Sequence, residues 1–262
     1  MEPDTLNGRF EFGLKLIADA GALALSYFNS RDRLTIASKG LQDMASEADV
    51  NTEMLIRERL ATAYPGDAFL GEETGISDYA PHQGIWVVDP IDGTQPFISG
   101  LTSWCVSIGF LQEGVIQFGM VYAPARNELF AGCVGHAATL NGKPISPSRA
   151  QSVRDGMVGA GYSPRSGPAR FLPAFTRLLE AGGIFAREGS GALALCYVAC
   201  GRLIGYFETH INSWDCLGAI AVLNAAGART SDFLAGDGLR NGNPIIAGNE
   251  AVFRQLTEFR GA

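Results

Sequence analysis

The sequence has little charge overall and no concentration of positive charge. Charged residues make up 18% of the 262 residues, and the formal net charge is −7 because acidic residues outnumber basic ones. No stripe of lysine and arginine and no basic tail occurs along the chain. Nucleic acid is therefore not expected as a partner. An acidic protein can still bind an anionic substrate if metal cations intervene.

Long apolar runs and paired cysteines are also missing. No run approaches the roughly 18 apolar residues that cross a bilayer, and the segment MEPDTLNGRFEF is acidic and resembles no secretion signal. We therefore expect a cytoplasmic protein with no membrane partner. The five cysteines are odd in number and show no CxxC spacing, which argues against disulfides and against a zinc site.

Apolar residues and glycine are plentiful. Apolar residues make up 47% of the chain, enough to fill one large domain or two closely packed halves. The 33 glycines allow many tight turns and close backbone approaches, which suits an active site built from loops.

Hydrophobic spacing predicts two helices in the first quarter of the chain. The first is a long amphipathic helix, in which steps of three and four residues put one set of side chains on one face: Phe10, Leu14, Ile17, Gly21, Ala24 and Phe28. A second helix is predicted from near Ser46 or Asp49 to Pro65-Gly66. The segment between them, 38–48, is polar.

Strand signals follow, and the second half alternates between strands and helices. A short buried strand, 85–88, is predicted to end at Asp89-Pro90, because proline cannot continue a sheet ladder. Strands at 104–111, 115–122 and 128–133 predict an antiparallel meander. Beyond residue 152, strands near 158–159 and 183–185 alternate with helices at 172–179, 191–200 and 214–226. We divide the chain into halves 1–145 and 146–262 that form one compact unit.

The segment Asp89-Pro90-Ile91-Asp92-Gly93-Thr94 is the strongest chemical signal. Asp89 and Asp92 lie three residues apart at a turn, and with the carbonyl of Ile91 they offer the oxygen ligands that Mg²⁺ prefers. The Thr94 hydroxyl can orient a water molecule. An ordinary surface turn is the alternative, because Asp and Gly favour turns for conformational reasons alone.

Two further acidic positions have structural alternatives of their own. Glu72 follows the apolar pair Phe69-Leu70, so it lies at a predicted strand end, where a solvated cap is also plausible. Asp215 follows Trp214 at the start of a predicted helix, where it can serve simply as a helix cap.

Taken together, three separated blocks resemble the inositol monophosphatases, a family of magnesium-dependent, lithium-sensitive phosphatases. Gly71-Glu72-Glu73, the segment from Trp86 to Thr94, and Trp214-Asp215 are similar to the family's GEE, WxxDPxDGT and WD signatures. The resemblance implies an α/β (α+β) fold, a layered αβαβα sandwich of the sugar and inositol phosphatase type. It also implies a homodimer, two or three Mg²⁺ ions, and inhibition by Li⁺.

The resemblance further implies a role for each residue. Glu72, Asp89 and the Ile91 carbonyl would bind one Mg²⁺, and Asp89, Asp92 and Asp215 a second. Glu72 and Thr94 would activate water, with Asp49 paired to Thr94. The implied substrate contacts are Asp92, Gly93, Thr94, Ser190, Gly191, Glu208 and Asp215. Lys39 is a further, outlying charged candidate, whereas His210, placed in the same predicted loop as Glu208, has no necessary part.

The sequence departs from the family pattern near the substrate. Gln95-Pro96-Phe97 follows the motif where Thr-Asn-Phe is common, and Asn212-Ser213 replaces His-Cys of animal members. The predicted function is hydrolysis of myo-inositol monophosphate or a related polyol or sugar phosphate, a small-molecule phosphate ester, by metal-activated water. Alternatives are a histidinol-phosphate, nucleotide or fructose bisphosphate phosphatase, and a protein-binding module that retains the fold.

Overall fold

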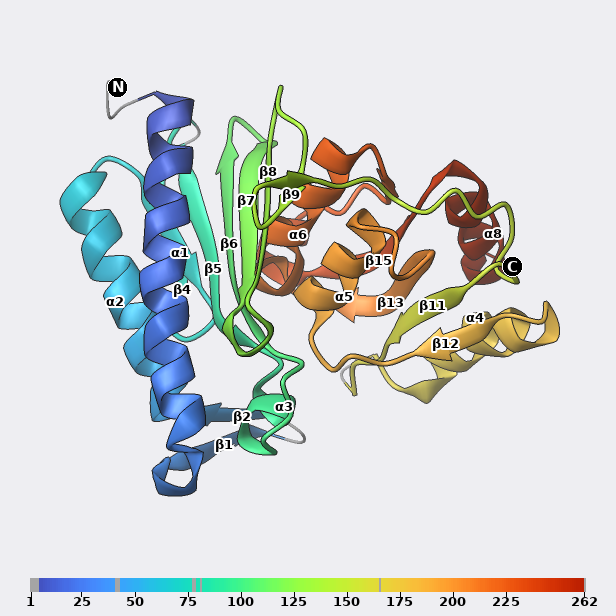
Figure 1. Ribbon diagram of the computed structural model, residues 1–262, viewed down its shortest axis with the longest axis horizontal. Helices are drawn as coiled ribbons and strands as arrows, with labels where there is room; N and C mark the ends of the chain where they lie inside the picture. The colour runs from blue at the N-terminus through green and yellow to red at the C-terminus, as the bar shows by residue number, and fades with distance from the viewer. Residues whose placement is uncertain (1–4, 41–42, 77–78, 81, 165, 262) are drawn as a thin grey trace.

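Two mixed β-sheets alternate with three layers of helices (Figure 1). The computed structural model describes residues 5–40, 43–76, 79–80, 82–164 and 166–261. The helices are α1 (Leu6–Asn29), α2 (Glu47–Ala63), α3 (Thr94–Ile98), α4 (Pro168–Glu180), α5 (Gly191–Ala199), α6 (Ser213–Ala226), α7 (Gly238–Asn241) and α8 (Glu250–Gly261), with 3₁₀ turns at Arg31–Arg33 and Pro124–Arg126.

The larger sheet has the strand order β10-β9-β8-β7-β6-β5-β3-β4, and the smaller has β12-β11-β13-β15-β14. The larger sheet contains β3 (Ala68–Gly71), β4 (Gly75–Ile76), β5 (Ile85–Asp92), β6 (Cys105–Gln112), β7 (Val115–Ala123), β8 (Glu128–Cys133), β9 (Thr139–Leu140) and β10 (Lys143–Pro144). The smaller contains β11 (Met157–Gly161), β12 (Ile184–Ala186), β13 (Gly205–Ile211), β14 (Arg229–Thr230) and β15 (Asn243–Gly248). A separate hairpin joins β1 (Ile36–Gly40) to β2 (Asp43–Ser46).

Three apolar clusters bind the layers together. One joins α1 and α2 to the outer face of the larger sheet, and a second fills the space around α5 and α6 between the two sheets. The third lies between the smaller sheet and helices α4 and α8. The predicted αβαβα sandwich is confirmed. No helix in the described ranges is long and apolar enough to cross a membrane.

The two predicted N-terminal helices are present, and local capping explains where they begin. The Thr5 hydroxyl accepts a hydrogen bond from the Gly8 amide at the start of α1. A capping box between Ser46 and Asp49 begins α2. The polar segment before α2, for which the sequence predicts no strand, carries the β1–β2 hairpin.

The predicted meander is formed by β6, β7 and β8, but β5 is longer than expected. It continues through Pro90 to Asp92, and its pairing with β6 shifts register between Asp89 and Asp92. A β-bulge tolerates proline because the missing amide hydrogen is not needed in the ladder there. The prediction that the strand ends at Asp89 was therefore wrong, and the bulge redirects the two carboxylates.

Helix α6 lies against the larger sheet, although it belongs to the second half of the chain (Figure 1). A Cβ atom placed on Gly119 of β7 would stand 2.3 Å from the carbonyl oxygen of Gly218 in α6. Two glycines therefore permit backbone contact between the helix and the strand. This close approach holds the first turn of α6, with Asp215, near the end of β5.

Candidate functional site

Three carboxylates from distant parts of the chain converge at one end of the larger sheet. Glu72, Asp89 and Asp215 each offer an oxygen atom, and these oxygens all lie within 4.8 Å of one another. Strands β3 and β5 run parallel, so Glu72 after β3 and Asp89 near the end of β5 meet at the same edge. Asp215 reaches this edge from the first turn of α6.

The electrostatics of this cluster fit a divalent cation. Asp89 is 1% exposed, and burial, followed by the negative charges of Glu72, Asp92 and Asp215, raises its pKa well above the usual range. A hard cation relieves such repulsion and takes carboxylate oxygens as its preferred ligands. The donor set of the described residues therefore suits Mg²⁺.

Asp92 lies beside these three carboxylates and is held by the N-terminal end of α5. Its Oδ2 atom accepts hydrogen bonds from the Ser190 hydroxyl at 2.6 Å and from the Ala192 amide at 2.7 Å. Burial, with the nearby charge of Asp215, raises the pKa of Asp92 to about 7. The second Mg²⁺ site, in which Asp92 is a ligand, stays a prediction.

The predicted pair of Thr94 and Asp49 is brought together. The Thr94 hydroxyl lies 3.4 Å from Asp49 Oδ1 and 3.2 Å from the carbonyl oxygen of Ile91. Asp49 is 1% exposed, and its other oxygen accepts hydrogen bonds from the amide and hydroxyl of Ser46. Burial raises the pKa of Asp49, although the bonds from Ser46 oppose that shift. Asp49 therefore caps α2 and also orients the Thr94 hydroxyl.

A pocket opens beside Asp92 and Asp215 and contains most of the predicted substrate contacts. Ser190, Gly191 and Glu208 line it together with those two aspartates, whereas Gly93 and Thr94 do not. Other lining residues that the sequence did not indicate include Tyr162, Arg187, Glu188 and Tyr206.

Glu208 lies on strand β13, which continues through the position where the sequence predicted a loop around His210. The Tyr206 hydroxyl donates a hydrogen bond of 2.6 Å to Glu208 Oε2, within the same strand. Burial raises the pKa of Glu208 to about 8, although this hydrogen bond opposes the shift. His210 is also on β13, and its Nε2 atom lies 3.0 Å from the carbonyl oxygen of Asn241. A carbonyl oxygen only accepts, so His210 donates and ties the strand to α7.

The raised pKa values predict how the stability of the metal-free protein depends on pH. Glu208 holds a proton in the folded state up to about pH 8 but releases it near 4.5 when unfolded, so the folded state binds more protons between those values. The free energy of unfolding in EDTA should therefore fall as pH rises from 5.5 to 8, by about 1–3 kcal/mol. Urea denaturation at both pH values measures this fall. It should be smaller in Glu208→Gln, and an equal fall would contradict the assignment.

The sequence analysis missed Glu53, a buried carboxylate that supports the turn around Glu72. Glu53 is 1% exposed, and it accepts hydrogen bonds of 2.9 Å from the amides of Glu73 and Thr74. Its spacing from Ile56 and Leu60 on α2 was the available signal, because i, i+3 and i+7 positions share one helix face. Lys39 is on β1, and its side chain lies outside the described residues.

Comparison with known proteins identifies related sequences and structures over nearly the whole chain. The model of the inositol monophosphatase family matches residues 8–258. The Nus factor SuhB of Haemophilus influenzae is 32% identical over 259 residues, covering 97% of both chains. An inositol-1-monophosphatase of Mesorhizobium japonicum is 34% identical over 232 residues, covering 87% of both. The crystal structure of the extragenic suppressor protein suhB from Bartonella henselae is 29% identical, with a TM-score of 0.87 over 95% of this chain and 96% of that one.

Proposed function

Because this chain belongs to the inositol monophosphatase family, we propose that it is a magnesium-dependent phosphomonoesterase acting on myo-inositol monophosphate or a related polyol or sugar phosphate. The convergence of Glu72, Asp89 and Asp215 within 4.8 Å carries this proposal. The homodimer and the cytoplasmic location expected from the sequence belong to the same proposal.

The carboxylates would hold Mg²⁺ in two groups. Glu72, Asp89 and the Ile91 carbonyl form the first, and Asp89, Asp92 and Asp215 the second, so that Asp89 is shared. When bound, Mg²⁺ makes water more acidic and offsets the negative charge that develops on the phosphate. Phosphate monoesters need that help, since their uncatalysed hydrolysis is among the slowest reactions known.

The remaining steps are assigned to residues of the chain itself. Thr94 accepts a hydrogen bond from the attacking water, because its own proton is directed to Asp49 or to the Ile91 carbonyl. Glu72 accepts the proton that this water loses. The amides of Gly93 and Thr94 donate to a phosphate oxygen. The leaving alkoxide takes its proton from a second water molecule, and no residue of the chain becomes phosphorylated in this scheme.

Glu208 would select the alcohol half of the substrate. It lines the pocket next to Asp215, where a carboxyl group can hydrogen-bond substrate hydroxyls. Glu208→Ala should lower kcat/KM for inositol 1-phosphate by about 10–100-fold, because a lost hydrogen bond to a substrate hydroxyl is costly in a pocket. The same variant should change hydrolysis of a phosphate ester with no hydroxyl groups by about threefold or less. Equal losses of kcat/KM on both esters would show that Glu208 does not recognise substrate hydroxyl groups.

A phosphate-release assay over a panel of phosphomonoesters tests the function directly. The panel contains inositol 1-phosphate, histidinol phosphate, a nucleotide monophosphate and fructose 1,6-bisphosphate, with Mg²⁺ and then with Li⁺ added. We expect Mg²⁺-dependent release that Li⁺ inhibits, and the highest kcat/KM for a polyol phosphate. The highest value for histidinol phosphate would select that alternative, and no release from any ester would refute the proposal.

A second candidate is a role in binding other proteins. It is favoured by the 32% identity to a relative named Nus factor SuhB and by the general independence of fold and function. The same panel separates the two candidates, because a chain that acts only by binding releases no phosphate from any ester.

A further inference from the structure

The turn at residues 92–94 packs between two other segments of the chain. Gly93 has φ of 92°, and a Cβ atom placed there would stand 2.8 Å from the carbonyl oxygen of Ser103 and 3.2 Å from the Cβ of Ser190. The Ser190 hydroxyl also bonds Asp92 at 2.6 Å. The segments 102–104 and 188–190 therefore form two walls that determine where Asp92 and Gly93 lie.

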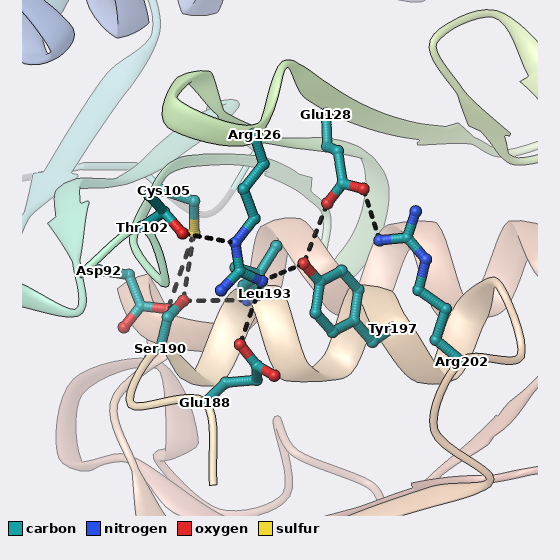
Figure 2. A network of polar contacts seen from close by, with 10 residues as sticks. All are labelled: Asp92, Thr102, Cys105, Arg126, Glu128, Glu188, Ser190, Leu193, Tyr197 and Arg202. Carbon is teal, nitrogen blue, oxygen red and sulfur yellow. Dashed lines mark hydrogen bonds and ion pairs between the residues drawn. The ribbon is translucent and has the colours of Figure 1, made fainter. Parts of the chain in front are cut away.

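Arg126, in the 3₁₀ turn before β8, bonds to both walls (Figure 2). Its Nε atom donates to the Thr102 hydroxyl at 3.3 Å, and Nη1 donates to Glu188 Oε2 at 3.1 Å. The planar guanidinium fixes the directions of these two donors relative to each other. A single side chain thus sets the spacing between the segments that enclose the turn.

The guanidinium is itself fixed by an aromatic partner. It donates a third hydrogen bond to the Tyr197 hydroxyl, which in turn donates to Glu128 Oε2 at 3.0 Å. Burial raises the pKa of Tyr197 to about 12, so its hydroxyl keeps the proton it donates. Arg126 therefore has restricted freedom before any ligand binds.

We propose that Arg126 is a positioning residue for the metal and phosphate site, acting through Thr102 and Glu188 on the turn of Asp92 to Thr94. This inference rests on the proposed function, because the turn is assigned there to Mg²⁺ and phosphate. A purely structural ion pair is the competing explanation. Arg126 and Glu188 are partly exposed, at 27% and 23%, and such pairs add only about 0–1 kcal/mol to stability.

Arg202 offers a matched control in the same network. Its guanidinium lies 4.9 Å from the centre of the Tyr197 ring, and it forms an ion pair of 2.5 Å with Glu128. Among the described residues, however, Arg202 makes neither of the bonds to Thr102 and Glu188 that Arg126 makes. Arg126→Met and Arg202→Met each remove one guanidinium beside Tyr197. Only Arg126→Met also removes the hydrogen bonds to Thr102 and Glu188.

The test measures Mg²⁺ binding by titration calorimetry, with Mg²⁺ alone as the probe, alongside Tm and phosphate release. Arg126→Met should raise the Kd for Mg²⁺ about 10-fold and lower kcat about 10–100-fold, because small displacements of catalytic groups are costly. Arg126→Lys keeps the charge but loses the planar fork, so it should recover only part of each effect. For Arg202→Met, the Kd for Mg²⁺ and kcat should stay within about twofold of the wild-type values. Its change in Tm should be similar to that of Arg126→Met.

The outcomes separate this proposal from the proposed function. Wild-type Mg²⁺ binding by a folded Arg126→Met protein would overturn the positioning role, as would equal losses of Mg²⁺ binding in Arg126→Met and Arg202→Met. A wild type that binds Mg²⁺ but hydrolyses no ester would refute the phosphatase, while the calorimetric comparison would still decide the role of Arg126. A wild type that binds no Mg²⁺ would overturn both.

Discussion

Asp89→Asn should abolish Mg²⁺-dependent phosphate release while leaving the fold intact. Asp89 is the carboxylate shared by both proposed Mg²⁺ groups, and asparagine keeps its shape but removes its charge. We expect kcat/KM to fall by at least about 1,000-fold, or about 4 kcal/mol of transition-state stabilisation. The measurement is steady-state phosphate release on the best ester of the panel at saturating Mg²⁺.

The same substitution should not destabilise the metal-free protein. Asp89 is buried against other carboxylates, which raises its pKa, so the charged form opposes folding at neutral pH. An asparagine at this position still accepts the hydrogen bond of 2.9 Å that Asp89 Oδ1 receives from the Ile91 amide. In EDTA, the urea midpoint of Asp89→Asn should equal or exceed that of the wild type.

Asp19→Asn is the matched control for this variant. Asp19 is 57% exposed on α1 and has only a distant ion pair with Arg59 at 3.8 Å, so its loss should change neither activity nor stability. Wild-type activity in Asp89→Asn would remove the metal site as the basis of the function. A lower urea midpoint in EDTA would show that the Asp89 charge is compensated in the folded protein.

Gly119→Ala should cause a large loss of stability. The added Cβ would stand 2.3 Å from the Gly218 carbonyl oxygen and 2.7 Å from the Gly218 Cα, and both are backbone atoms that no side-chain rotation can move. Helix α6 must therefore shift away from β7. We expect the free energy of unfolding, measured by urea denaturation, to fall by about 3 kcal/mol, the upper part of the range for overpacking.

Gly66→Ala controls for the loss of glycine itself. No atom lies within 4 Å of a Cβ placed on Gly66, so the stability change there should stay within about 0.5 kcal/mol. Because Asp215 lies in the first turn of α6, Gly119→Ala should also weaken Mg²⁺ binding. A fully stable Gly119→Ala protein would mean that α6 tolerates displacement from the sheet.

The sequence predicted local elements well where hydrophobic spacing was regular. Helix α1 and the meander of β6, β7 and β8 occur as expected, because α1 has regular steps of three and four residues and the strands are apolar runs separated by turn residues. The pattern was misleading where pairing partners are distant. Strand β13, with Glu208 and His210, is paired with β11 and β15, and nothing in its own residues identifies those neighbours.

Residue chemistry nominated Asp89 and Asp92, because carboxylates match the oxygen ligands of Mg²⁺. The resemblance of three separated motifs to the inositol monophosphatases then added Glu72 and Asp215. Only the tertiary structure decided their geometry. Three features bring Glu72, Asp89 and Asp215 together: the parallel pairing of β3 with β5, the bulge within β5, and the contact of Gly119 with Gly218. Asp92 is held beside them by its hydrogen bond from Ser190. Glu53 and Arg126 act across the fold on segments distant in sequence. Long-range contacts of this kind depend on packing between layers, and packing is not encoded in any single segment of the chain.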